Sequence, residues 1–327
     1  MYFPISHTEL AVLPLILIGF TAGATSAFWG VGGGWIIVPA FFILGLPMNF
    51  AVGTSLAFIT SSALFSTLRH KKLGNVDVKL GLLLVAGKIP GVEIGVIAVE
   101  YLKNTGNLSS IISIIYLLLL GFISFMVFYE TFKTSRKNQY IEKNTSESPL
   151  IFGIGQKIHS FRMPPFISSP VPGVDSFSIW VVIVIGVISG LLSGLLGIGG
   201  SVIMLPLIFY VIGLPTHIGV GTSLLTVLIA GLYGTFSHAL KGNVDISVAF
   251  IALIGAVLGT QIGGIATSVV NDIRIRFLFG VGIAGCFLSI VLKLFNLTAL
   301  STVLILGLSG ILSLLITSYF VKSFTKS

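Results

Sequence analysis

The stretch Gly30-Val31-Gly32-Gly33-Gly34 separates a long apolar run from a short one near 35–46. The stretch Gly197-Ile198-Gly199-Gly200-Ser201 stands in the same way before a short run near 201–214. Glycine runs inside apolar sequence break a helix and expose backbone N–H groups. Since irregular backbone persists at membrane depth only where protein or a wet cavity surrounds it, we expect each short run to be a Gly-broken re-entrant or half-helix segment.

Both glycine stretches belong to an internal repeat that relates residues 19–95 to residues 186–263. Equivalent residues are 167 positions apart up to the pair Pro39 and Pro206. The second repeat then contains one additional residue, and equivalent residues are 168 positions apart from there on. The longest matches after the insertion are Gly45-Leu46-Pro47 with Gly213-Leu214-Pro215, Val52-Gly53-Thr54-Ser55 with Val220-Gly221-Thr222-Ser223, and Gly74-Asn75-Val76-Asp77 with Gly242-Asn243-Val244-Asp245. A period this long indicates a duplicated domain rather than a solenoid, a plan that many secondary transporters share.

The composition is that of a membrane protein. Of 327 residues, 55% are hydrophobic and 9% are charged, with a mean hydropathy of +1.08, whereas a soluble domain carries about 25% charged residues. We predict an all-α polytopic membrane protein with about nine transmembrane helices, built from two homologous repeats. The predicted spans lie near residues 10–30, 50–69, 79–99, 109–129, 178–197, 217–238, 246–268, 275–295 and 298–320.

The charge distribution indicates the partners of the chain. The net charge of +8 comes from Lys and Arg that lie mostly between apolar runs, where such residues orient a membrane protein. The expected partners are therefore the lipid bilayer and a small anionic substrate rather than a nucleic acid. The single cysteine, Cys286, excludes a disulfide scaffold. The oligomeric state does not follow from the sequence.

The chain divides into a first transmembrane repeat (1–130), a polar linker (131–177) and a second repeat with a C-terminal helix (178–327). The linker is rich in Lys, Arg and Pro, so we expect it to be cytoplasmic and without regular structure. Counting nine spans then places the N-terminus inside and the C-terminus outside, with both Gly-Asn-Val-Asp turns cytoplasmic and the repeats parallel. If each short run also crosses the membrane, every repeat has five spans and the repeats are inverted. The count of nine spans instead favours the parallel arrangement.

The glycine stretches are the candidate substrate site. Their N–H groups, together with the start of the following short helix, suit an anion; a purely structural break is the alternative. Hydroxyls near the start of the next helix either cap that helix or donate to an oxyanion. The candidate substrate-binding residues are Gly32, Gly33, Gly34, Thr54, Ser55, Gly199, Gly200, Ser201, Thr222 and Ser223. The Asn-Val-Asp segments are expected to serve turns and N-caps.

Two ionisable residues, Lys88 and Glu93, lie well inside a predicted span, where charges are costly and often functional. Their repeat counterparts are Ala256 and Gln261, so neither belongs to a symmetric site. Glu93 either carries a coupling proton or pairs with a basic residue of a neighbouring helix. Because the repeated core has no Lys or Arg at matching positions, we predict that uncharged donors recognise the anion.

We expect neither an enzyme nor a bound cofactor or metal. The His, Cys and carboxylate residues do not cluster with metal-ligand spacing. Gly307-Leu308-Ser309-Gly310 matches the short G-x-S-G pattern of intramembrane serine proteases, but no His follows it to activate the serine. No Walker loop is present, so ATP hydrolysis on this chain is excluded.

The duplicated pattern resembles the TauE/SafE sulfite exporter family, also called the TSUP family. The resemblance rests on Gly30-Val31-Gly32-Gly33-Gly34 with Pro39, on Val52-Gly53-Thr54-Ser55 and on Gly74-Asn75-Val76-Asp77, each of which recurs. Ser201 in place of a fifth glycine and the long linker depart from it. The resemblance implies a multi-pass carrier in the cell (inner) membrane for sulfite, sulfoacetate or another organosulfonate, driven by an ion gradient. An anion channel of similar architecture is the alternative.

Overall fold

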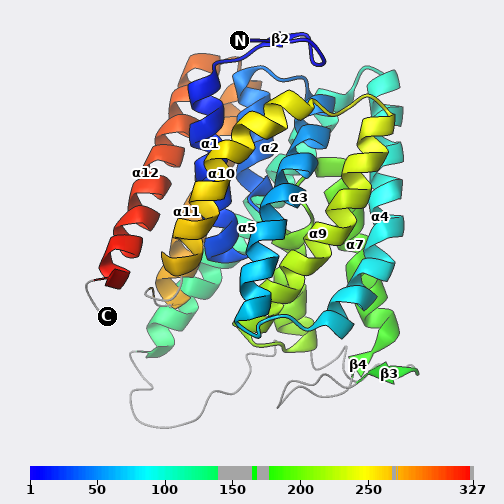
Figure 1. The fold of residues 1–327 in the computed structure, drawn as a ribbon, viewed down its shortest axis with the longest axis vertical. Helices are drawn as coiled ribbons and strands as arrows, with labels where there is room; N and C mark the ends of the chain where they lie inside the picture. Colours follow the sequence, from blue (N-terminus) through cyan, green and yellow to red (C-terminus); the bar gives the residue numbers. More distant parts are fainter. Residues whose placement is uncertain (139–163, 168–176, 267–269, 271, 325–327) are drawn as a thin grey trace.

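The computed structural model describes residues 1–138, 164–167, 177–266, 270 and 272–324 (Figure 1). The first half of the chain forms α1 (Val12–Trp29), α2 (Gly34–Leu44), α3 (Met48–Lys72), α4 (Val78–Asn104) and α5 (Leu108–Asn138). The second half forms α7 (Ile179–Leu196), α8 (Ser201–Leu207) with the π-helix η1 (Ile208–Ile212), α9 (Thr216–Leu240), α10 (Ile246–Ala266), α11 (Asp272–Leu294) and α12 (Thr298–Phe324). Two small antiparallel sheets pair β1 (Tyr2–Phe3) with β2 (Thr8–Glu9) and β3 (Phe166–Ile167) with β4 (Phe177–Ser178).

The chain is an all-α polytopic membrane protein. Within the described residues, 9 helices are long and apolar enough to cross a membrane. They correspond to the spans predicted from the sequence. α2 has 11 residues and α8 has 7, so both are too short to cross alone, as the glycine stretches indicate.

The short helices reverse the direction of the chain. In Figure 1, α1 descends from the end that carries the N-terminus, and α2 returns to that end, where α3 begins. α7 likewise rises from the opposite end, and α8 with η1 returns to it before α9 starts. We call the end where α5 ends and α7 begins the linker face, and the opposite end the N-terminal face.

The two Gly-Asn-Val-Asp turns consequently lie at opposite ends of the molecule. Asp245 Oδ2 accepts a hydrogen bond of 2.7 Å from Ser6 Oγ, beside the N-terminus. The turn that holds Asn75 packs on Gly221, near the start of α9 at the linker face. The parallel arrangement favoured by the sequence count is therefore wrong. Each broken helix enters and leaves by one face, so it adds no net crossing, and the segments 19–95 and 186–263 run in opposite directions.

The same geometry corrects the side on which α5 ends and α7 begins. The end of α5, the start of α7 and the end of α12 all lie opposite the N-terminus, whereas the count of nine spans placed the end of α5 on the side of the N-terminus (Figure 1). In the part of the chain that the structure describes, most Lys and Arg residues lie at the linker face and few lie at the N-terminal face. The helices and turns at the N-terminal face contribute Lys103, Lys241 and Lys293. Those at the linker face contribute Arg69, Lys71, Lys72, Lys79, Lys133, Arg136, Lys137, Arg274, Arg276 and Lys322.

Close glycine contacts join the two halves of the chain. α1 packs along α10, and α4 packs along α7. A Cβ added at Gly87, Gly91 or Gly95 of α4 would lie 2.2–2.4 Å from backbone oxygens of α7. Their counterparts on α10, which are Gly255, Gly259 and Gly263, would meet backbone oxygens of α1 at 2.1 Å. Small residues allow this approach between helices in a membrane, so these glycines serve packing.

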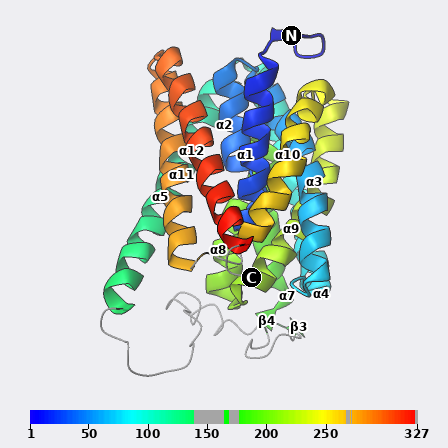
Figure 2. The same cartoon turned by 60° about the vertical axis from the view of Figure 1, so that its left-hand side comes forward.

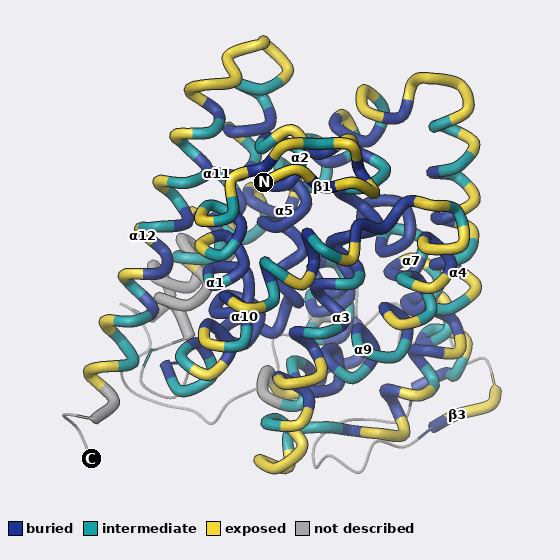
Figure 3. Tube along the Cα trace, turned by 45° about the horizontal axis from the view of Figure 1, so that its top comes forward, coloured by how far each residue is buried: buried dark blue, intermediate teal, exposed yellow. Residues whose placement is uncertain are grey.

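The burial of side chains is arranged around these contacts. Buried residues concentrate on α1, α2 and α3, whereas the outer turns of α4 and α12 are exposed (Figure 3). The exposed side chains of α12 include Leu314 and Ile311, which suit contact with lipid. α11 packs against both α5 and α12 at one side of the bundle (Figure 2).

Candidate functional site

Two glycine loops interrupt the helices within the interior of the molecule. The first glycine loop, residues 30–33, joins α1 to α2, and the second glycine loop, residues 197–200, joins α7 to α8. Three glycines in each loop have φ values between +72° and +79°. L-amino acids with a side chain rarely adopt this left-handed region, so glycine at these positions is a conformational requirement.

The two loops meet between the middles of α3 and α9. A Cβ added at Gly32 would lie 3.1 Å from Ile59 Cγ2 and 3.7 Å from Val227 Cγ1. A Cβ added at Gly199 would lie 3.2 Å and 3.3 Å from the same two atoms. Ile59 and Val227 are near the centres of their 25-residue helices. The loops therefore lie at mid-depth, where the halves of the chain come together.

The loops also contact each other directly. Ser201 Oγ donates a hydrogen bond to the carbonyl oxygen of Val31. A Cβ added at Gly34 would lie only 2.5 Å from Ile198 Cα. The sequence places Gly34 and Ser201 at equivalent positions, but their roles differ here. Gly34 allows the loops to approach, and Ser201 links them.

Backbone N–H groups of both loops are available for a ligand. In the hydrogen bonds of the described residues, the N–H groups of Gly32–Gly34 and Gly199–Ser201 donate to no protein acceptor. The first N–H groups of a helix lack partners within it, and the helix dipole adds positive partial charge there. The start of α2, an 11-residue helix, is thus aimed at mid-depth with unpaired donors. Such an arrangement suits an anion.

Thr54 and Thr222 hold the turns of the opposite half. Thr222 Oγ1 accepts the N–H of Asp77 at 3.0 Å, and Thr54 Oγ1 accepts the N–H of Asp245 at 2.9 Å. Both threonines are fully buried. These contacts lie toward the two faces rather than at the meeting point of the loops, so the structure gives the hydroxyls a tethering role.

The aspartates of the two turns cap the helices that follow. Asp77 Oδ1 accepts the N–H of Leu80 at 3.0 Å at the start of α4. Asp245 Oδ1 accepts the N–H groups of Ser247 and Val248 at 3.1 Å and 3.3 Å at the start of α10. The predicted turn and N-cap role of these segments is confirmed.

Ser55 and Ser223 are equivalent in sequence but different in their contacts. Ser55 Oγ donates to the carbonyl oxygen of Gly197 at 2.9 Å, so it supports the second glycine loop. Ser223 is also fully buried, but its hydroxyl has no partner among the described residues. Of the four predicted hydroxyls, Ser223 is therefore the one left without a protein contact.

Lys88 is fully buried on α4. Its Nζ donates to Thr226 Oγ1 of α9 at 3.1 Å. Thr226 Oγ1 in turn donates to the carbonyl oxygen of Ser223 at 2.8 Å and lies 3.5 Å from Met204 Sδ of α8. Thr226 precedes Val227, so the amine lies at the depth of the glycine loops. Sequence reasoning missed Thr226, although its spacing of three from Ser223 places both on one side of α9.

Glu93 lies one and a half turns beyond Lys88 on α4 and is partly exposed. Its Oε2 accepts hydrogen bonds from Tyr233 at 2.9 Å and from Ser237 at 2.8 Å, both on α9. The alternative that Glu93 pairs with a basic residue is not found among the described ion pairs. Gln261 is the repeat counterpart of Glu93, and its Oε1 accepts a hydrogen bond of 3.5 Å from Arg69 Nη1. The carboxylate of Glu93, which contacts α9, is thus matched by the guanidinium of Arg69, which contacts α10.

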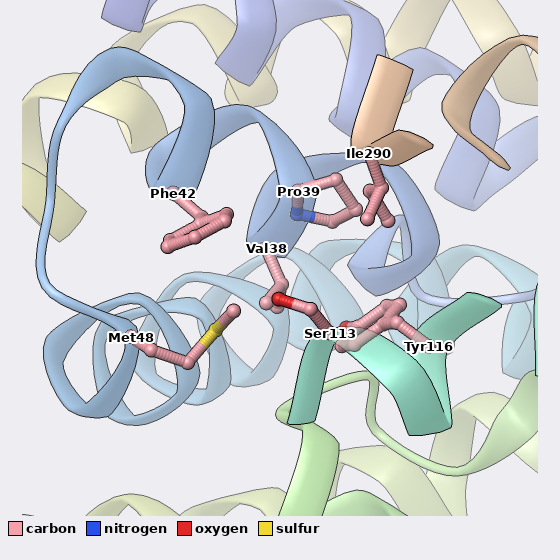
Figure 4. Close-up of a pocket in the computed structure, with 7 residues that line it drawn as sticks. All are labelled: Val38, Pro39, Phe42, Met48, Ser113, Tyr116 and Ile290. Carbon is pink, nitrogen blue, oxygen red and sulfur yellow. The ribbon is translucent and has the colours of Figure 1, made fainter. Parts of the chain in front are cut away.

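A small cavity lies beside α2, away from the glycine loops. Figure 4 shows its lining by Val38, Pro39, Phe42, Met48, Ser113, Tyr116 and Ile290. Its volume of about 10 Å³ is at the lower limit for one water molecule. The cavity is a packing gap rather than a site for an anion. Tyr116 on its border donates to the carbonyl oxygen of Leu196, next to the second glycine loop, at 2.8 Å.

Comparison with known proteins assigns the chain to a family of transporters. The family model for the sulfite exporter TauE/SafE matches residues 15–292. The probable membrane transporter protein YunE of Bacillus subtilis is 28% identical over 257 residues, which cover 76% of this chain and 86% of that protein. The probable membrane transporter protein MJ0441 of Methanocaldococcus jannaschii is 26% identical over 306 residues, 88% of this chain and 99% of that protein. No solved structure matches the chain significantly.

Proposed function

The chain belongs to the TauE/SafE sulfite exporter family and is a membrane transporter, and we propose that it is a secondary carrier of small sulfur-containing anions. Sulfite, sulfoacetate and other organosulfonates are the substrate class. These anions present several oxygen acceptors around sulfur, so they suit a site made of converging N–H donors. An ion gradient drives the transport, and the carrier acts in the cell (inner) membrane.

The observation that carries this proposal is the meeting of the two glycine loops at mid-depth. The loops contact each other between α3 and α9, and the N–H groups of Gly32–Gly34 and Gly199–Ser201 have no acceptor among the described residues. Each hydrogen bond from a neutral N–H donor to the charged oxyanion contributes about 1.5–3 kcal/mol, so a small number of them binds the anion and still permits its release. Broken helices at the interface of two repeats are the usual location of substrate in secondary transporters.

The inverted arrangement supports alternating access. The first glycine loop belongs to a segment that enters from the N-terminal face, and the second to one that enters from the linker face (Figure 1). A rocking movement of one half against the other would therefore expose the same centre to each face in turn. Ile59 and Val227 lie beside both loops at mid-depth, so their side chains line this centre.

The basic linker face is cytoplasmic in this proposal, because loops rich in Lys and Arg remain inside. The N-terminus then lies outside, and the end of α12 lies inside. Glu93, held by Tyr233 and Ser237, is the candidate group for a coupling proton. Residues 131–177 form a cytoplasmic linker, of which 139–163 and 168–176 lie outside the described residues. The expectation of no regular structure is wrong at its described parts, where α5 continues to Asn138 and β3 spans Phe166–Ile167.

The test compares glycines that have the same backbone conformation in different places. We expect Gly32→Ala and Gly199→Ala to reduce sulfite uptake into vesicles at least about tenfold, because a methyl group narrows the centre beside Ile59 and Val227. Gly74→Ala and Gly242→Ala are the matched controls. Their φ values are +72° and +68°, but nothing lies within 4 Å of the added Cβ. They incur the same backbone strain and should transport like the parent protein.

Equal losses in the control and loop variants would contradict the proposed site. Collapsing the proton gradient distinguishes a proton-coupled carrier from an anion channel. Coupled uptake stops with an uncoupler, whereas flux through a channel continues to follow the anion gradient.

A further inference from the structure

Lys88 is a buried amine that the fold leaves without a carboxylate partner among the described residues. Its side chain is fully buried at mid-depth, on the helix that packs along α7. Among the described residues, the ion pair within 4.0 Å joins Lys103 to Glu100 at the N-terminal face, and no carboxylate approaches Lys88. An unpaired charge at this depth is costly unless an ion of opposite sign joins it.

The hydrogen bonds of the amine are also incomplete. An ammonium group has three N–H donors, and Thr226 Oγ1 is the acceptor that the described residues provide. Thr226 is itself fixed, because its hydroxyl donates to the carbonyl oxygen of Ser223. The remaining donor capacity of Lys88 therefore has no protein partner in the described part of the chain. An oxyanion would supply both the charge and the acceptors.

A second buried hydroxyl on α9 lies close to Thr226. Ser223, whose buried hydroxyl has no described partner, lies one turn before Thr226 on α9. The positions equivalent to Lys88 and Thr226 are Ala256 and Phe58, which are apolar and buried. The amine of Lys88 and the hydroxyl of Thr226 therefore have no counterpart in the other half of the repeat.

We propose, on the basis of the function proposed above, that Lys88 is the charged group that contacts the transported oxyanion, with Thr226 as the hydroxyl that positions its amine. The substrate carries at least one full negative charge, and one anion binds per chain. The glycine N–H groups complete its coordination. This assignment replaces recognition by uncharged donors alone with a one-sided, charge-assisted site.

A buried lysine that only stabilises the fold would behave differently when its charge is removed. Replacing a buried charge with an apolar side chain of similar length is often neutral or stabilising. We therefore expect Lys88→Met to keep or raise the thermal stability of the ligand-free protein. The same variant should lose the stabilisation that sulfite gives to the parent protein. A structural lysine would give the opposite result, with lower stability and retained sulfite binding.

The experiment measures sulfite uptake and sulfite-dependent thermal stabilisation of the full chain, in vesicles and in detergent. For Lys88→Met we expect the KM for sulfite to rise at least about thirtyfold, since an interaction with a buried charge is lost. For Thr226→Val we expect a rise of about fivefold, as one hydroxyl contact is removed. Thr235→Val on the same helix is the matched control and should keep the parent KM.

The outcomes separate this inference from the proposed function. If the parent protein neither binds nor transports sulfite or an organosulfonate, the proposed function is wrong. If the parent transports and Lys88→Met keeps a KM within about threefold of it, the inference about Lys88 is overturned while the function stands. Should Lys88→Met fail to give monodisperse protein, Thr226→Val decides, because a KM equal to that of Thr235→Val overturns the inference.

Discussion

The helix pairs α1 with α10 and α4 with α7 are alike in their backbone contacts and different in their chemistry. A Cβ added at Gly23 of α1 would lie 2.5 Å from the carbonyl oxygen of Ala256, and one at Gly190 of α7 would lie 2.1 Å from that of Lys88. These two glycines are equivalent in the repeat, and so are the residues that they touch. One contact nevertheless places a methyl group at mid-depth, and the other places an amine there.

The difference indicates which features the duplication preserves. Glycines and turn residues recur in both halves because each close contact depends on backbone shape, which tolerates no side chain. Lys88, Thr226 and Glu93 do not recur, because Ala256, Phe58 and Gln261 occupy the equivalent positions. The scaffold is therefore paired, whereas Lys88 and Glu93 within α4 have no ionisable counterpart on α10.

The backbone contacts should be the most sensitive feature of the comparison. We expect Gly23→Leu and Gly190→Leu each to destabilise the protein by more than about 3 kcal/mol, because the side chain meets backbone that cannot move aside. Size-exclusion chromatography and thermal unfolding in detergent would measure the loss. Gly310→Leu is the control, since nothing lies within 4 Å of its added Cβ on α12. Normal folding of either variant would break the proposed equivalence of the two pairs.

The inverted arrangement predicts an all-or-none difference between equivalent positions. Lys72 at the end of α3 and Leu240 at the end of α9 are both exposed. In a Cys286→Ser background, Leu240→Cys should react with an impermeant maleimide in intact cells, and Lys72→Cys should react only after permeabilisation. Labelling of both from the same side would restore the parallel arrangement and contradict the fold. Replacing Cys286, the single cysteine of the chain, leaves no other thiol to react.

The hydroxyl contacts should show smaller, graded effects. We expect Thr54→Val and Thr222→Val each to cost about 1–3 kcal/mol of stability, because each leaves a buried aspartate N–H without its acceptor. Ser223→Ala should change stability by less than about 0.5 kcal/mol, as its hydroxyl has no described partner. Thermal unfolding of the ligand-free protein would test this order. A larger loss of stability in Ser223→Ala would show that the Ser223 hydroxyl makes a contact that stabilises the fold.

The sequence predicted the helices, the broken segments and the pairs of equivalent residues. Apolar length and glycine position depend on local chemistry, so they can be read without knowing the neighbours of a helix. The aspartate caps at Asp77 and Asp245 were also predictable, since capping partners lie within three residues. The direction of the repeats was not predictable in this way, because it depends on whether a short helix returns or continues.

The sequence by itself determined that this is a duplicated, glycine-broken membrane protein with candidate donors at Gly32–Gly34 and Gly199–Ser201. Only the tertiary structure decided that the two loops meet, that Thr54 and Thr222 tether turns, and that Lys88 lies beside Thr226. These contacts join residues more than a hundred positions apart. Spacing along the chain fixes which side of a helix a residue occupies, but the packing of distant helices fixes what that side faces.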